Sequence, residues 1–189
     1  IEVWQNGSYS VTVTHPTNGC VATSVPVAVT VNTTFPPTIV ASGPTEFCQG
    51  GSVSLSVEPG PYNSYLWSSG STTPSISVIE TGDYGVTVLD ANNCIDSTLL
   101  GNPLHIEVWD PQPNAVQQGD SVVVTNGPFS TYQWYFNGLP VAGATNYYHL
   151  PAASGNYICV VTDENGCEGD SYNVEFTFTG IVDLGEDYN

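Results

Sequence analysis

The chain has 189 residues, with no Lys, no Arg and 18 acidic side chains, so its formal net charge is −18. A surface of this sign repels phosphate backbones and anionic lipids, which excludes nucleic acid and membrane surfaces as partners. Hydrophobic residues make up 40% of the chain and aromatic residues 11%, a composition typical of a β-rich globular protein rather than of a disordered one. No apolar run approaches the ~20 residues that span a bilayer, so direct membrane insertion is not expected.

One phrase occurs three times: GSYSVTVTHPTNGC at 7–20, GDYGVTVLDANNC at 82–94 and GNYICVVTDENGC at 155–167. Its tyrosines are separated by 75 residues (84 − 9) and by 73 residues (157 − 84). A near-constant period of this length indicates a tandem array of small domains rather than a solenoid. The predicted organisation is the C-terminal part of a domain at 1–32, complete domains at 33–109 and 110–179, and a C-terminal linker at 180–189.

The first part begins with IEVW at 1–4, which aligns with residues 76–79 of the second copy. The tyrosine strand follows, and then a last strand that ends near Val31. This part therefore contains only the final strands of a repeat.

The second copy contains short runs with a two-residue alternation, separated by turns rich in Gly, Pro and Asn. Strands are predicted at 52–57, at 64–68 with Trp67, at 75–79, at 82–90 and at 95–108. The third copy repeats the plan, with strands at 121–125, at 131–138 with Trp134, and at 155–163. Apolar residues nowhere recur with a helical period over three turns, so no helix is expected.

This pattern predicts an all-β fold of tandem Ig-like antiparallel β-sandwiches. In such a sandwich a tyrosine near the start of the penultimate strand folds into the core and hydrogen-bonds to upstream backbone. Tyr84 and Tyr157 should therefore be buried. The linkers near 32–37 and 110–113 are short and contain proline, so we expect a semi-rigid rod.

The five cysteines lie at positions 20, 48, 94, 159 and 167. In the second copy Cys48 precedes the first core strand and Cys94 follows the last hairpin turn. In the third copy Gln117 replaces Cys48, and Cys159 has only Cys167 as a partner within its repeat. We predict the pairs Cys48–Cys94 and Cys159–Cys167, which imply an oxidising, extracytoplasmic setting.

The run WSSGSTTPSISVIETGDYGVTVLDANNC at 67–94 resembles the Ig-like repeats of Bacteroidota cell-surface proteins, including the large gliding and adhesin-like cargo of the type IX secretion system. The segment FCQGGSVSL at 47–55 resembles the usual start of these repeats. The ending FTGIVDLGEDYN at 178–189 resembles the segment that often precedes a removable sorting domain. The resemblance implies export to the cell surface and a role as an adhesive stalk, spacer or filament element.

The last hairpin is rich in oxygen-bearing side chains that could hold calcium as a cofactor: Asp163, Asn165, Glu168 and Asp170. The alternative is that these residues serve only as good turn formers. Two serines, Ser97 and Ser121, lie in Asp-Ser-Thr and Asp-Ser-Val sequences, which resemble an O-glycosylation site known in this phylum.

Tyr135 is the candidate glycan-binding residue. Alternation sends Trp134 inward and Tyr135 outward, where its ring could stack on a sugar. The competing interpretation is that the aromatic residues of the third copy are core and cross-strand pairs.

Catalysis is not expected, because a G-x-S-x-G motif is absent and the three histidines are scattered. The predicted function is therefore a stalk, spacer or filament element of a secreted cell-surface protein. Its partners would be neighbouring Ig-like domains of the same or adjacent chains, other surface proteins, or glycans. The alternatives are a glycan-binding accessory module of a secreted hydrolase, and a subunit of a homopolymeric extracellular fibre whose first part is completed by a neighbour's strands.

Overall fold

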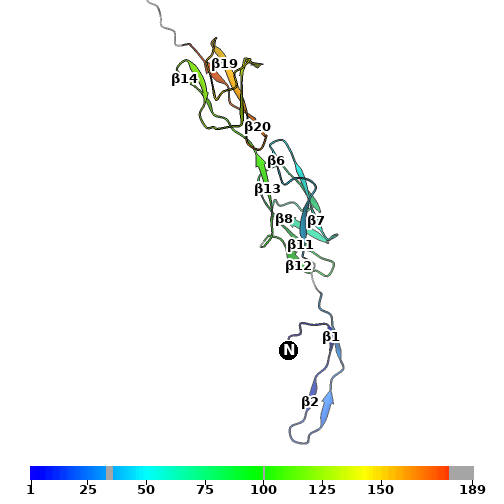
Figure 1. Cartoon of the computed structure of the whole chain (residues 1–189). Helices are drawn as coiled ribbons and strands as arrows, with labels where there is room; N and C mark the ends of the chain where they lie inside the picture. Colours follow the sequence, from blue (N-terminus) through cyan, green and yellow to red (C-terminus); the bar gives the residue numbers. More distant parts are fainter. Residues whose placement is uncertain (33–35, 100, 179–189) are drawn as a thin grey trace, which may run out of the picture. The chain divides into compact units, whose positions relative to one another are not determined.

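A computed structural model describes residues 1–32, 36–99 and 101–178, and it confirms the all-β fold class (Figure 1). Within these residues the regular structure consists of strands, and no helix is long and apolar enough to cross a membrane. The chain divides into two compact units. One comprises Ile1–Ser42, Ser54–Ile76 and Asp83–Leu104, and the other comprises Gly43–Val53, Ser77–Gly82 and His105–Asn189. The domain boundaries drawn from the repeats remain predictions, and the predicted linker at 180–189 lies outside the described residues.

The second copy forms three small sheets. The first has the order β5-β7-β9, the second β12-β11-β8 and the third β10-β13-β6. The pairs β5–β7, β8–β11 and β11–β12 are antiparallel, whereas β6 and β13 run parallel. The strands are β5 (Thr38–Ala41), β6 (Glu46–Cys48), β7 (Val53–Glu58), β8 (Ser64–Trp67), β9 (Ser75–Val78), β10 (Gly82–Tyr84), β11 (Val86–Leu89), β12 (Ile95–Ser97) and β13 (Leu104–Trp109).

Alternation along these strands produces the core of the second copy. In β7 the buried residues are Val53, Leu55 and Val57, while their neighbours are exposed or half-buried. In the facing group of strands Trp67 is only 2% exposed, and its indole nitrogen donates a hydrogen bond to the Thr73 carbonyl oxygen at 2.8 Å. Trp67 is therefore a core residue of the second copy.

The third copy forms two sheets, β14-β15-β18 and β17-β16-β19-β20, and β21 also pairs with β19. One buried cluster joins Val122 and Val124 of the first sheet to Trp134, Tyr157 and Phe176 of the second, which makes this copy a two-layer sandwich. Its strands are β14 (Ala115–Gln118), β15 (Ser121–Val124), β16 (Thr131–Phe136), β17 (Leu139–Pro140), β18 (Tyr148–His149), β19 (Gly155–Thr162), β20 (Glu168–Asp170) and β21 (Val174–Phe176).

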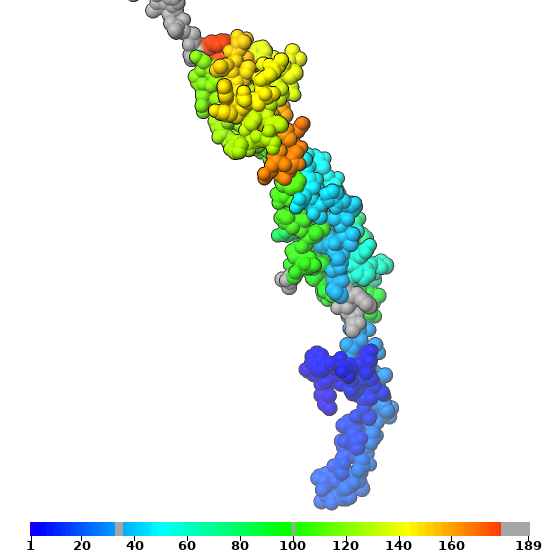
Figure 2. Space-filling view, in the orientation of Figure 1, coloured from blue at the N-terminus to red at the C-terminus, as the bar shows by residue number. Residues whose placement is uncertain are grey.

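The first part contains two pairs of short strands: β1 (Gly7–Tyr9) with β4 (Val27–Val29), and β2 (Thr12–Thr14) with β3 (Val21–Thr23). Figures 1 and 2 show these residues as a slender ribbon. Apolar side chains that alternation would place in a core are exposed here: Val11 is 57% and Val13 is 58% exposed. Their counterparts in the second copy, Val86 and Val88, are buried.

The tyrosine of the repeated phrase makes the predicted hydrogen bond. The Tyr157 hydroxyl donates to the Ala153 carbonyl oxygen at 3.0 Å, and the Tyr9 hydroxyl donates to the Gln5 carbonyl oxygen at 3.0 Å. Tyr157 is 2% exposed, as predicted, whereas Tyr84 is half-buried. The bond fixes the loop four residues before each of these two tyrosines.

Both predicted disulfide pairs are wrong, because the structure joins Cys48 to Cys167. The two Cα atoms are 5.3 Å apart and 119 residues apart in sequence, and Cys94 and Cys159 are free thiols. The bond therefore links the start of the second copy to the last hairpin turn of the third, and it lies within one compact unit.

Strand register explains why the predicted pairs do not form. Cys48 pairs in register with Trp109, the last residue of β13. Cys94, in contrast, comes just before β12, which precedes β13 in the chain. The length of β13 alone is about 17 Å, beyond the ~7 Å that a disulfide can bridge. Cys159 lies opposite Ser171, to which its backbone N–H donates at 2.9 Å, so Cys167 lies several residues further along the hairpin.

Candidate functional site

The outward face of the sheet β17-β16-β19-β20 is the candidate site. Tyr135 of β16 is in register with Ile158 of β19, and Val160 of β19 is in register with Asp170 of β20. Because neighbours in register share a face of a sheet, these four side chains lie on the side opposite to Trp134. The prediction that alternation turns Tyr135 outward agrees with this register.

A shallow hollow of about 330 Å³ lies on this face. It is lined by the half-buried side chains of Tyr135, Ile158 and Val160 and by the exposed carboxylates of Glu168 and Asp170, with Gly138 and Gly169 completing it. The apolar floor can cover one face of a ligand, while the carboxylates can accept hydrogen bonds at its edge. Figure 2 shows the residues of β20, in orange, at the molecular surface.

Electrostatics restrict what the hollow can bind. The whole sequence contains no Lys or Arg, so neither Glu168 nor Asp170 can form a salt bridge with such a residue of this chain. In the described part of the chain no hydrogen bond engages the Tyr135 hydroxyl. The site can therefore accept hydrogen bonds from a neutral polyhydroxyl ligand or attract a cation, and it repels anions.

The carboxylates predicted to hold calcium at the last hairpin are not grouped as a set of three metal ligands, and calcium binding there remains a prediction. Among residues 1–32, 36–99 and 101–178, no group of three His, Cys, Asp or Glu side chains is arranged to hold a metal ion. Asp163 serves the turn instead, because its Oδ1 accepts the backbone N–H groups of Asn165 and Cys167, each at 2.9 Å. The structure thus brings Glu168 and Asp170 to the hollow beside Tyr135 and leaves Asp163 and Asn165 in the turn.

The two candidate glycosylation serines have engaged hydroxyls. Ser97 is half-buried, shares a hydrogen bond of 3.0 Å with the Thr87 hydroxyl, and accepts the Leu99 N–H at 3.1 Å. The Ser121 hydroxyl donates to the Gln118 carbonyl oxygen at 2.8 Å. Modification at either serine remains a prediction.

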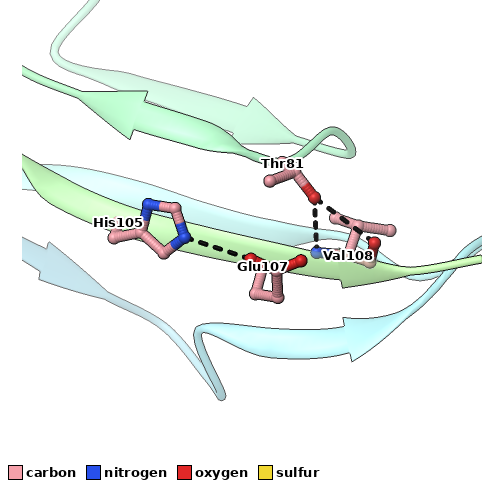
Figure 3. Close-up of polar contacts among 4 residues, drawn as sticks. All are labelled: Thr81, His105, Glu107 and Val108. Atoms are coloured by element: carbon pink, nitrogen blue, oxygen red, sulfur yellow. Dashed lines mark hydrogen bonds and ion pairs between the residues drawn. The ribbon is translucent and has the colours of Figure 1, made fainter.

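The histidines are not gathered into a site either. His105 lies within hydrogen-bonding distance of Glu107, 3.2 Å between Nε2 and Oε2, on one side of β13 (Figure 3). On the same strand, the Val108 N–H donates to the Thr81 hydroxyl at 2.8 Å. This bond holds the loop between β9 and β10 against β13. His149 packs beside Trp134, and burial lowers the pKa of its imidazole.

Sequence reasoning named Tyr135 as a glycan contact and Glu168 and Asp170 as calcium ligands, but it did not place the two carboxylates beside the tyrosine. Glu168 and Asp170 alternate along β20, so both had to share one face of the strand. Which face of the sheet they share depends on the register of β20 against β19, and a hairpin turn sets that register.

Comparison with protein-family models and with curated proteins found no match. Among the solved structures that are similar are the following two. The fibronectin(III)-like modules of CbhA from Clostridium thermocellum are 12% identical, with 75% of this chain and 95% of that chain covered and a TM-score of 0.31. The SGBP-B protein of the mixed-linkage glucan utilization locus of Bacteroides ovatus, solved with a mixed-linkage heptasaccharide, is 18% identical, with a TM-score of 0.29. The alignment covers 77% of this chain and 48% of that one.

Proposed function

We propose that the chain is a non-catalytic structural segment of a secreted bacterial cell-surface protein, in which tandem Ig-like repeats act as a stalk or spacer. Consecutive repeats with the same strand arrangement suit a protein that holds its two ends a fixed distance apart. The resemblance to repeats of type IX-secreted surface proteins and the disulfide favour an extracellular location.

The disulfide is the observation that carries this proposal. Because Cys48 and Cys167 are covalently joined, tension applied to the chain passes from one sulfur to the other and bypasses the residues between them. Most of the second and third copies therefore bears no load along its backbone. A bond in this position suits a protein that must keep its length under tension.

Single-molecule force spectroscopy tests the proposal. The oxidised chain should hide the 119-residue stretch between the bonded cysteines. At ~3.4 Å per residue, Cys48→Ser should lengthen the fully extended chain by about 400 Å. The stalk role also requires the oxidised chain to stay folded at loads that unfold Cys48→Ser.

Cys94→Ser is the matched control, because it removes a cysteine that the structure leaves free. Its extension curve should equal that of the unaltered chain. Identical curves for the oxidised chain and Cys48→Ser would contradict the stalk proposal.

A second candidate function, glycan binding by an accessory module, is supported by the hollow around Tyr135. An aromatic ring beside two carboxylates offers a stacking surface and acceptors for sugar hydroxyls. Titration calorimetry against a panel of soluble neutral polysaccharides tests it. Tyr135→Ala should weaken binding at least about tenfold, a loss of ~1.4 kcal/mol.

Tyr172→Ala is the control for that experiment, because Tyr172 is 87% exposed and does not line the hollow. Equal weakening by both variants would point to non-specific adsorption. No binding by the unaltered chain to any polysaccharide would exclude this candidate.

A homopolymeric fibre is the third candidate, and the exposed apolar face of the first part supports it. Val11 and Val13 are exposed where the second copy buries Val86 and Val88 beside a tryptophan strand. Strands of a second copy of this chain could cover that face. Light scattering should then show concentration-dependent assembly that is lost when Val11 and Val13 are both replaced by Ser. A monomer at all concentrations would exclude the fibre.

A further inference from the structure

The hairpin turns that carry Cys94 and Cys167 have the same geometry. In the second copy Asp90 Oδ1 accepts the backbone N–H of Asn92 and of Cys94, both at 2.8 Å. In the third copy Asp163 Oδ1 accepts the equivalent two N–H groups at 2.9 Å. The backbone also closes in the same way, because the N–H of each aspartate donates to the carbonyl oxygen of its cysteine, at 3.0 and 2.9 Å.

The first part closes a related turn that is one residue longer and has His15 in place of the aspartate. The His15 N–H donates to the Cys20 carbonyl oxygen at 2.8 Å, and the Gly19 N–H donates to the His15 carbonyl oxygen at 3.0 Å. Cys94 and Cys167 therefore occupy the same point of the same turn, and Cys20 ends a turn that is one residue longer. Of the three, only Cys167 is bonded in the structure, since Cys20 and Cys94 are free.

The partner of Cys167 belongs to the copy that comes before it. Cys48 lies beside Trp109 at the end of its repeat, and the Gln49 N–H donates to the Trp109 carbonyl oxygen at 2.9 Å. Gln117 takes the same position in the third copy, because its side-chain amide exchanges hydrogen bonds with the backbone of Thr177, at 2.9 and 3.2 Å. The third copy thus has glutamine, not cysteine, at the position equivalent to Cys48.

The disulfide observed in the structure therefore joins two positions that recur in the repeat. It joins the cysteine before the first core strand of one copy to the turn cysteine of the next copy. The position equivalent to Cys48 in the copy that precedes the second lies outside residues 1–32, which contain only final strands.

We propose that Cys94 forms an equivalent disulfide with the cysteine at the Cys48 position of the copy that precedes its own. We propose the same for Cys20, whose partner would lie in the copy before the first part. When each disulfide forms, two thiols lose two protons and two electrons and form one S–S bond. A disulfide-bearing oxidant, such as glutathione disulfide or an oxidised thiol–disulfide oxidoreductase, accepts both electrons and both protons and becomes two thiols.

Exposure separates these two cysteines from the third free thiol. Cys20 is exposed and Cys94 is half-exposed, so both can meet a partner from outside their own copy. Cys159 is fully buried in the core of the third copy and can meet none. The inference rests on the proposed stalk function in that both require consecutive repeats to be joined, but the two are tested by different measurements.

The test is a disulfide map of a lengthened chain. Residues 1–30 are replaced by an additional copy of residues 36–109, which places a complete repeat, with its own Cys48, before the second copy. The additional copy carries Cys94→Ser, to remove its own turn cysteine, and Ser52→Ala, to mark its Cys48 peptide by mass. The protein is oxidised in a glutathione and glutathione disulfide buffer and digested without reduction.

Trypsin has no site in the chain, but cleavage after glutamate places Cys48, Cys94, Cys159 and Cys167 in four different peptides. The expected product is a linked pair that joins the marked Cys48 peptide to the Cys94 peptide, and this pair should be lost when Cys94 of the second copy is changed to Ser. The native Cys48–Cys167 pair in the same digest shows that the repeats are folded and oxidised.

A free Cys94 thiol beside an intact Cys48–Cys167 pair would overturn the inference, and so would a bond from Cys94 to Cys48 of its own copy. If the lengthened chain fails to fold, the unaltered 189-residue chain provides a second measurement. There Cys94 should be fully alkylated under native conditions, and a disulfide of Cys94 within that chain would also overturn the inference. None of these outcomes alters the force test of the Cys48–Cys167 bond.

Discussion

The Tyr157 hydroxyl provides a local test of the repeat at the scale of one residue. The Tyr157 ring is buried, and within the described residues its hydroxyl donates one hydrogen bond, to the Ala153 carbonyl oxygen. Tyr157→Phe keeps the ring and removes the bond, so it should lower the free energy of unfolding by about 1 kcal/mol. Hydrogen exchange of the β19 amides measures the change in this copy alone. Tyr172→Phe, at an exposed position, should leave exchange unaltered, and equal effects of both variants would contradict the prediction.

Cys159 gives a second prediction at the same scale. Desolvation by burial raises the pKa of its thiol to about 11, and a backbone hydrogen bond from Gln133 offsets part of the increase. At pH 8 only about one molecule in 10³ should carry the reactive thiolate. Iodoacetamide should therefore alkylate Cys20 and Cys94 in the native chain and leave Cys159 unmodified until the chain is unfolded. Mass spectrometry of the alkylated peptides checks this, and rapid native alkylation of Cys159 would show that the thiol is not buried.

At the scale of strands, alternation correctly predicted that Trp134 points inward, but it did not predict that Val11 and Val13 are exposed. It was not enough for the disulfides. A cysteine pair depends on which end of the sandwich each residue reaches, and that follows from strand register. Cys159 opposes Ser171 rather than Cys167, a relation that the spacing of the two cysteines does not reveal. The hollow beside Tyr135 was missed for the same reason, because it depends on the pairing of β20 with β19.

The close approach of β20 to the preceding linker gives a prediction for this element. A β-carbon added at Gly169 would overlap the Pro111 carbonyl oxygen, which belongs to the backbone and cannot rotate away. Gly169→Ala should therefore force a backbone shift and lower the free energy of unfolding by about 1–3 kcal/mol. Urea denaturation measures the loss. Gly43→Ala adds the same methyl group where no atom lies within 4 Å, so it should cause no comparable loss. Equal midpoints for the two variants would show that β20 and the linker are not in contact.

At the scale of the whole molecule, the repeats were visible in the sequence because each copy has the same turn, tyrosine and cysteine. The connection between copies was not visible, since a bond over 119 residues joins positions that no short pattern relates. The bond closes a segment that contains most of the second and third copies into a covalent loop. The proposed stalk function therefore rests on the position of two sulfur atoms rather than on the fold of either repeat.

The charge of the whole chain gives the last prediction. With a net charge of −18 and no Lys or Arg, the carboxylates repel one another more in the folded chain than in the expanded unfolded chain. Raising NaCl from about 0.01 M to about 0.5 M shortens the Debye length from about 30 Å to less than 8 Å, so the thermal midpoint should rise with salt. Calorimetry at constant pH measures it, and a midpoint that falls with salt would contradict the argument. Calcium chloride at equal ionic strength tests the predicted calcium site, because a midpoint well above that in NaCl would require calcium binding in addition to screening.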